Sequence, residues 1–303
     1  MLILTFGYLY RRLFVLNNFD ELVNGFTFAY SGNKIPLLLG VLLLMLVNWG
    51  IETYKWQKLM HKLEHLNFWQ AYKAVFAGVT VSFFTPNRVG EFMGRIIFLK
   101  KSNKIKAILG TIIGSFSQLA CTCVFGALGF GYYYANSSDT NEFLPPWFFV
   151  IVAIGMVLLY FNIWVGHWVV EKIKLKSVAR YTAILTRYKT RELFHVLLLS
   201  ASRYMVFASQ YVIMLYFFDV EIGLLNTLGA VSVIFLVQTS IPSLGFSELG
   251  NRGMAIVYVF GAFASVNELS LLSAAYSLWA LNIAIPSLIG LIFILQAKFY
   301  PNK

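Results

Sequence analysis

Long apolar runs constrain this chain more than any other feature of its sequence. A helix that crosses a bilayer needs about 20 mostly apolar residues. Hydrophobic residues make up 59% of the 303 positions and charged residues only 12%, against about 25% charged in soluble domains. We therefore predict an all-α fold, a polytopic integral membrane helical bundle, with a single transmembrane domain over residues 1–303 and no fused soluble enzyme domain. The apolar runs cover residues 2–16, 35–58, 68–99, 105–134, 147–168, 191–218, 221–267 and 269–295.

The basic residues are concentrated in a few connections between these runs, and the formal net charge is +11. Residues 100–106 contain four lysines and residues 172–191 contain seven lysines and arginines, whereas the charged residues of 136–146 and 219–221 are all acidic. Cytoplasmic loops of membrane proteins carry an excess of Lys and Arg. We therefore expect the basic connections, and the lysine-containing C-terminus, on the cytoplasmic side of an inner membrane. This pattern favours contact with anionic lipid headgroups over binding of nucleic acid.

The number of crossings predicts two re-entrant hairpins. The basic residues of 55–62 and of 100–106 are both expected on the cytoplasmic side, so residues 68–99 begin and end inside and must cross the membrane an even number of times. This segment is too short for two full spans. Residues 221–267 begin and end outside. Two half-helices joined at a break fit each segment, which gives about six full spans and two oppositely oriented hairpins, as in inverted-repeat transporters. Kinks that merely bend packed helices are the alternative, and the depth of the first run around Arg11 and Arg12 stays open.

The first break provides the strongest candidate site. It reads Thr85-Pro86-Asn87-Arg88-Val89-Gly90-Glu91, and Arg95 follows. A charge inside a bilayer is unfavourable by about 3 kcal/mol, so its presence indicates a function. If residues 89–97 form a half-helix, Arg88, Glu91 and Arg95 share one face and the carboxylate lies between two guanidinium groups. This set would hold a lipid phosphate or form a closed structural ion-pair cluster.

The second break, Ile241-Pro242-Ser243-Leu244-Gly245-Phe246-Ser247-Glu248, is followed by Arg252, which can pair with Glu248. Arg203 lies deep in an apolar run and shares a helical face with Gln210, so both should point into the bundle. Arg203 suits either a headgroup or a carboxylate of another helix. Three amides in apolar runs are explained by interhelical hydrogen bonds alone: Asn48, Gln118 and Gln238.

Signals for an enzyme or a metal site are poor. His61 and His65 could supply two ligands, but a catalytic zinc site needs three, and no catalytic constellation is found. We expect no metal and no cofactor. Residues 171–191 combine apolar positions with seven cations, which is typical of an interfacial basic helix. This segment is also where a homo-oligomer contact or a soluble partner would bind.

The two breaks resemble the signature segments of the lysylphosphatidylglycerol synthase transmembrane region family. These flippase-like proteins are similar to the N-terminal membrane part of multiple peptide resistance factor. Residues 49–60 also resemble the family's second helix. The resemblance implies movement of a lipid or polyprenyl-linked headgroup between leaflets. In bifunctional members a soluble aminoacyl transferase domain follows the membrane region, and this synthase activity is not implied for the present sequence.

The prediction from the sequence is thus a lipid translocase without covalent chemistry, whose partner is an anionic membrane lipid. The rivals are a membrane-embedded lipid-modifying transferase, with Glu91 or Glu248 as base, and a non-transporting membrane scaffold. The candidate substrate-binding residues are Pro86, Arg88, Gly90, Glu91, Arg95, Arg203, Pro242, Gly245, Glu248 and Arg252.

Overall fold

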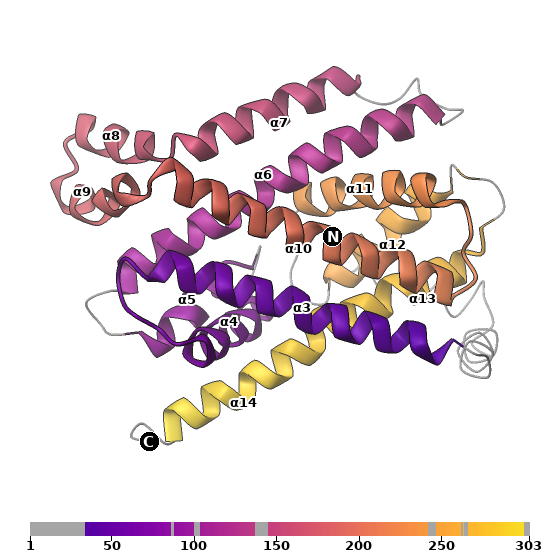
Figure 1. Cartoon of the computed structure of the whole chain (residues 1–303), viewed down its shortest axis with the longest axis horizontal. Helices are drawn as coiled ribbons and strands as arrows, with labels where there is room; N and C mark the ends of the chain where they lie inside the picture. The colour runs from indigo at the N-terminus through magenta and orange to yellow at the C-terminus, as the bar shows by residue number, and fades with distance from the viewer. Residues whose placement is uncertain are drawn as a thin grey trace.

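The computed structural model describes residues 34–85, 88–99, 104–136, 145–241, 247–261, 263 and 266–299. All regular structure in this part of the chain is helical (Figure 1), which confirms the all-α prediction. The expected first run, with Arg11 and Arg12, lies outside the described residues. The elements are α3 (Ile35–Met60), α4 (Phe68–Phe83), α5 (Gly90–Arg95), η3 (Ile96–Phe98), α6 (Lys104–Asn136), α7 (Pro146–Phe161), α8 (Trp164–Lys172), α9 (Lys176–Thr182), η5 (Ala183–Arg187), α10 (Thr190–Phe217), α11 (Leu224–Ser240), α12 (Ser247–Phe260), α13 (Glu268–Trp279), η6 (Ala280–Ala284) and α14 (Ile285–Phe299).

Four helical stretches in the described residues are long and apolar enough to cross a membrane: α3, α6, α10 and the stretch Glu268–Ala297. The pair α7 and α8 adds a fifth span if its two parts are counted together. These five match the predicted runs at 35–58, 105–134, 147–168, 191–218 and 269–295. The protein is therefore an integral membrane protein with a helical bundle.

The run at 147–168 differs from a single straight helix. α7 and α8 meet at an angle of 74°. At the bend, the Asn162 side chain donates to the Leu158 carbonyl and accepts a hydrogen bond from Trp164 Nε1. A side chain that bonds the backbone of the preceding turn competes with continuation of the helix. α7 alone, with 16 residues, extends for about 24 Å.

The basic segment at 171–191 is not one interfacial helix, contrary to the prediction. It comprises the end of α8, the short helix α9 and the 3₁₀ turn η5. Lys174, between α8 and α9, has a φ of 61°, a left-handed conformation that interrupts a right-handed helix. The apolar residues Ile173, Leu175 and Val178 are nevertheless exposed, so the segment still presents an apolar and basic surface.

Both predicted breaks separate two helices that pack against each other. α4 is followed by α5, and α11 is followed by α12. The contact between α4 and α5 requires glycine, because a Cβ at Gly94 would clash with the backbone of Ala77 and Gly78. α4 begins with a capping box formed by Asn67 and Gln70. Whether these hairpins are re-entrant in a bilayer remains a prediction.

The helices α3 and α10 run antiparallel and side by side (Figure 1). At one end, Lys62 after α3 pairs with Glu192 in the first turn of α10. At the other end, Lys34 before α3 pairs with Asp219 after α10.

On α3, Asn48, Glu52 and Lys55 follow at spacings of four and three, so they share one face. They contact Ser200 and Arg203 of α10, so the two helices meet along one polar seam. This seam positions the site described next.

Candidate functional site

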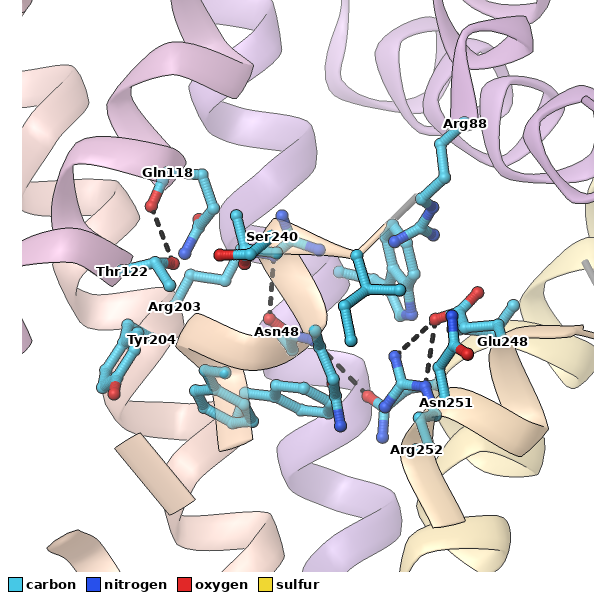
Figure 2. Close-up of a pocket in the computed structure, with 18 residues that line it drawn as sticks. Asn48, Arg88, Gln118, Thr122, Arg203, Tyr204, Ser240, Glu248, Asn251 and Arg252 are labelled. Carbon is cyan, nitrogen blue, oxygen red and sulfur yellow. Dashed lines mark hydrogen bonds and ion pairs between the residues drawn. The ribbon is translucent and has the colours of Figure 1, made fainter. Parts of the chain in front are cut away.

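A cavity of about 540 Å³ lies among α3, α6, α10, α11, α12 and η6. Figure 2 shows side chains from these separate elements pointing toward one another around it. Its lining combines aromatic and aliphatic groups with an unusual number of amides, hydroxyls and guanidinium groups. The lining residues are Asn48, Trp49, Arg88, Gln118, Thr122, Arg203, Tyr204, Phe207, Phe235, Gln238, Thr239, Ser240, Ile241, Glu248, Asn251, Arg252, Asn282 and Ile283.

Described residues beside both breaks line this cavity. On α12, Arg252 forms an ion pair with Glu248 at 2.6 Å, one helical turn away. Arg88, from the first break, points toward the same carboxylate (Figure 2) and lies close enough to interact with it electrostatically. Arg88 and Glu248 are distant in sequence, yet both line the cavity. The remaining candidates in the breaks, Pro86, Pro242 and Gly245, lie outside the described residues.

Arg88 does not share a helical face with Glu91 and Arg95, which corrects the prediction from the sequence. α5 begins only at Gly90, and Arg88 has a φ of 58°. This left-handed conformation is unfavourable for a residue with a Cβ, and the Arg88 side chain lines the cavity, whereas those of Glu91 and Arg95 do not. The helical spacing argument therefore holds for Glu91 and Arg95 alone.

A buried ion-pair network adjoins the cavity. At its centre, the Glu52 carboxylate contacts Arg95 and Lys55 at 2.7 Å each. The same carboxylate contacts Arg203 at 2.9 Å. Arg95 also pairs with Glu91. Charges are retained in an apolar interior only when they are paired and hydrogen-bonded, so this network ties α3, α5 and α10 together.

Lys55 belongs to this network and not to the predicted cytoplasmic flank. Its side chain is only 1% exposed. Besides Glu52, its Nζ donates to the Gly114 carbonyl and to Ser200 Oγ, each at 3.3 Å. Ser200 in turn shares a 2.6 Å hydrogen bond with Ser117. Glu52 and Lys55 are three residues apart in an apolar run, a signal for a buried ion pair that the sequence analysis did not use.

Arg203 connects the network with the cavity. Its Nε donates to Asn48 Oδ1 at 3.0 Å and its Nη1 to Glu52 at 2.9 Å, while the guanidinium lies 5.2 Å from the centre of the Trp49 ring. The side chain also lines the cavity. As expected, Arg203 and Gln210 both face the bundle: Gln210 is fully buried and donates to the Val41 carbonyl at 3.0 Å.

Three other candidates lie behind the cavity, in the α4–α5 hairpin. Gly90 donates from its backbone N–H to Thr85 Oγ1 at 2.7 Å, which holds the two helices across the break. Glu91 and Arg95 are members of the ion-pair network and are not among the residues that line the cavity. The structure thus divides the candidates into a group that faces the cavity and a group that supports it.

The amides that the sequence analysis explained by interhelical bonding all line the cavity: Asn48, Gln118 and Gln238. Asn282 and Asn251 join them. Asn282 lies in η6, a π-helical turn, and accepts a hydrogen bond from Asn48 at 3.4 Å. Single π-helical turns are frequent at functional sites, but no periodicity in the sequence reveals one.

Several polar atoms at the cavity have no hydrogen-bond partner among the described residues. They include the donors Trp49 Nε1 and Gln238 Nε2 and the acceptor Gln118 Oε1. A buried polar atom without a partner is unfavourable by about 1–3 kcal/mol. With three guanidinium groups and one carboxylate in the lining, the cavity offers hydrogen-bond donors and positive charge, which suit an anion. Within the described residues, no group of three or more His, Cys, Asp or Glu residues is arranged to hold a metal ion.

Comparison with known proteins identifies the family. The family model described as the lysylphosphatidylglycerol synthase TM region matches residues 13–297. Neither curated proteins nor solved structures give a significant match. Since the family match spans nearly the entire sequence, including both breaks and the helices that build the cavity, the chain belongs to the lysylphosphatidylglycerol synthase TM region family.

Proposed function

We propose that the protein is a lipid translocase that moves an anionic phospholipid or a polyprenyl-linked headgroup between the two leaflets. Membership of the family associates this membrane protein with lipid metabolism or translocation. The observation that carries the proposal is the cavity with three guanidinium groups and a single carboxylate, which is already paired with Arg252. Guanidinium groups bind phosphate oxygens in a bidentate manner, so a headgroup phosphate is the ligand that this lining fits.

The arrangement of the helices supports a route for the headgroup. The cavity lies where α11 and α12 meet α3 and α10, and Arg88, from the segment between α4 and α5, also lines it. In inverted-repeat transporters, broken helices surround the substrate site and alternately expose it to each side. Arg88 and Arg252 would hold the phosphate, Arg203 would complete the set, and Glu248 would orient Arg88 and Arg252. The ion-pair network behind them would keep Arg203 in position.

The alternative of a lipid-modifying transferase receives less support. A general base needs a carboxylate that is free to accept a proton from the substrate. Glu91 pairs with Arg95, and Glu248 pairs with Arg252. A scaffold without transport would not need a polar cavity within the bundle, because uncompensated polar groups there are unfavourable.

Reconstitution into liposomes distinguishes these three functions. We expect the wild-type protein to move a fluorescent phosphatidylglycerol between leaflets while mass spectrometry finds the lipid mass unchanged. Arg88→Gln should reduce transport by about 10- to 100-fold, the effect of losing a hydrogen bond to a charged group, with little loss of stability because no ion pair of Arg88 is seen among the described residues.

The matched control is Arg180→Gln, the same substitution at an exposed residue of α9. It should leave transport unchanged. A new lipid mass would support the transferase instead, and neither transport nor a new mass would support the scaffold. Equal transport by Arg88→Gln and wild type would remove Arg88 from the substrate site.

We further propose an inner-membrane orientation with the C-terminus in the cytoplasm, based on the positive-inside pattern. A cysteine introduced at Ser177 in α9 should react with a membrane-impermeant maleimide only in inside-out vesicles. A cysteine at Glu221, before α11, should react only in right-side-out vesicles. Both positions are exposed, and the native Cys121 and Cys123 are buried. The reverse pattern would invert the topology.

A further inference from the structure

A second cavity, of about 630 Å³, lies at the end of the bundle where α3 ends and α10 begins. It is separate from the proposed substrate cavity, and the two have no lining residue in common. We propose that this second cavity binds the headgroup of an anionic lipid from the leaflet at the basic end of the bundle. The inference goes beyond the proposed function, because it assigns a binding site that transport through the first cavity does not require.

The floor of the second cavity is apolar, and hydrogen bonds fix the segments that form it. Leu59 is 1%, Val196 3% and Tyr188 8% exposed. The Tyr188 hydroxyl donates to the Leu59 carbonyl at 2.9 Å, and Gln57 Nε2 donates to the Leu66 carbonyl at 2.8 Å. These bonds connect the end of α3 with the segments that precede α10 and α4. The floor is therefore a formed surface that can take the first carbons of an acyl chain.

The rim of the second cavity is positively charged. Its one lining carboxylate, Glu192, is already paired with Lys62 at 2.7 Å. Lys62 also donates to the Arg187 carbonyl and lies 5.3 Å from the centre of the Tyr188 ring. Lys58 has no ion pair among the described residues, and its Nζ lies 5.1 Å from the centre of the Tyr54 ring. Within the part of the chain that the structure describes, the rim thus retains a cation, Lys58, that is not paired with a carboxylate.

Two imidazoles complete the rim. His61 and His195 line the cavity from α3's end and from α10, and each ring supplies at least one nitrogen for hydrogen bonding. A phosphate between α3 and α10 would therefore meet donors on both helices.

Two features favour a lipid over a soluble anion. The first is the combination of an apolar floor with a cationic rim, since a soluble anion would gain nothing from the floor. The second is location: the cavity lies at the end of a membrane-spanning helix, beside Tyr54, which is 44% exposed. Exposed tyrosines and lysines at helix ends are typical of the headgroup region of a membrane.

The second cavity also lies on the same pair of helices as the first. Along α3, the first cavity is lined at Asn48 and the second at Lys58; at 1.5 Å per residue these positions are about 15 Å apart. Between them lie Glu52, Lys55 and Ser200, the polar seam of the ion-pair network. The two headgroup sites are therefore arranged in series along α3 and α10.

Native mass spectrometry in a neutral detergent tests the proposal by counting bound lipids. With added phosphatidylglycerol, the wild type should retain two lipids per chain, and with phosphatidylcholine none at the same concentration. Lys58→Glu should weaken one of the two binding events by about tenfold or more, as expected for loss of a charge-assisted contact. Arg88→Gln should weaken the other, and the double variant both. His195→Glu, from the facing helix, should repeat the effect of Lys58→Glu.

The control is Lys176→Glu, an identical charge reversal at an exposed residue of α9. If this variant loses the lipid as Lys58→Glu does, general attraction to the basic surface explains the binding and the site is excluded. If Lys58→Glu and His195→Glu both retain two lipids, the proposal is wrong. If free glycerol 3-phosphate displaces the lipid at equal concentration, the ligand is a soluble anion. Because the readout is binding, a protein that fails to transport lipid would still test this site.

Discussion

Glu52→Gln is expected to lower the free energy of unfolding by about 3–5 kcal/mol, the effect of removing one partner from a buried ion-pair network. The substitution keeps the size of the side chain but leaves Lys55, Arg95 and Arg203 without their shared carboxylate. Arg95 retains Glu91, whereas the other two cations lose their only ion pair among the described residues. The measurement is the thermal unfolding midpoint of the purified protein in detergent, followed by loss of the monodisperse species.

Glu221→Gln is the matched control, because Glu221 is exposed and the described residues give it no ion pair. Its midpoint should stay at the wild-type value. A Glu52→Gln protein that unfolds at the same temperature as the control would show that the network is not required for the fold. In that case its charges would have to be explained by binding alone.

Arg203→Gln should separate function from stability. Glu52 keeps Lys55 and Arg95 in this variant, so the unfolding midpoint should fall much less than in Glu52→Gln. The cavity, however, loses one of its three guanidinium groups. Binding and transport of phosphatidylglycerol should decrease by about 10- to 100-fold, the magnitude for a hydrogen bond to a charged group.

Arg203→Lys provides the sharper comparison. Lysine restores the charge beside Glu52 but cannot reproduce the planar fork that contacts Asn48 and Glu52 together,. We expect it to recover the unfolding midpoint and only part of the transport. Arg191→Gln, at an exposed residue of the same helix, is the control. Full transport by Arg203→Gln would place Arg203 in the supporting network and remove it from the substrate site.

The structure separates the candidate cations into two groups. Glu91 and Arg95 belong to a closed ion-pair cluster with Glu52, as the structural alternative anticipated. Arg88 and Arg252 face the cavity instead. Spacing alone could not separate these groups, because it assumed that Arg88 continued the helix of Glu91 and Arg95. The positive φ at Arg88 interrupts that helix.

The sequence by itself determined the membrane-spanning helices. The predicted runs at 105–134 and 191–218 correspond to α6 (Lys104–Asn136) and α10 (Thr190–Phe217). This information is local: a segment that crosses a bilayer must be apolar over about 20 residues and must satisfy its backbone hydrogen bonds internally. The positions of the two breaks were also local, because each contains a proline, which lacks the backbone N–H that the interior of a helix requires,.

Only the tertiary structure decided which polar residues share a site. Lys55 is predicted from the sequence to lie in the cytoplasmic flank, and no role is predicted for Glu52. Both are buried, Glu52 paired with Arg95 of α5 and Arg203 of α10, and Lys55 bonded to Ser200 of α10. Arg88 and Glu248 are brought to one cavity from two hairpins. The physical reason is that an ion pair forms only when two helices distant in sequence are in contact and are rotated so that the two charged side chains face each other. The hydrophobic pattern of a single helix determines neither its neighbours nor its rotation. In a bilayer this matters more than in water, because lipid tails drive no particular helix face inward.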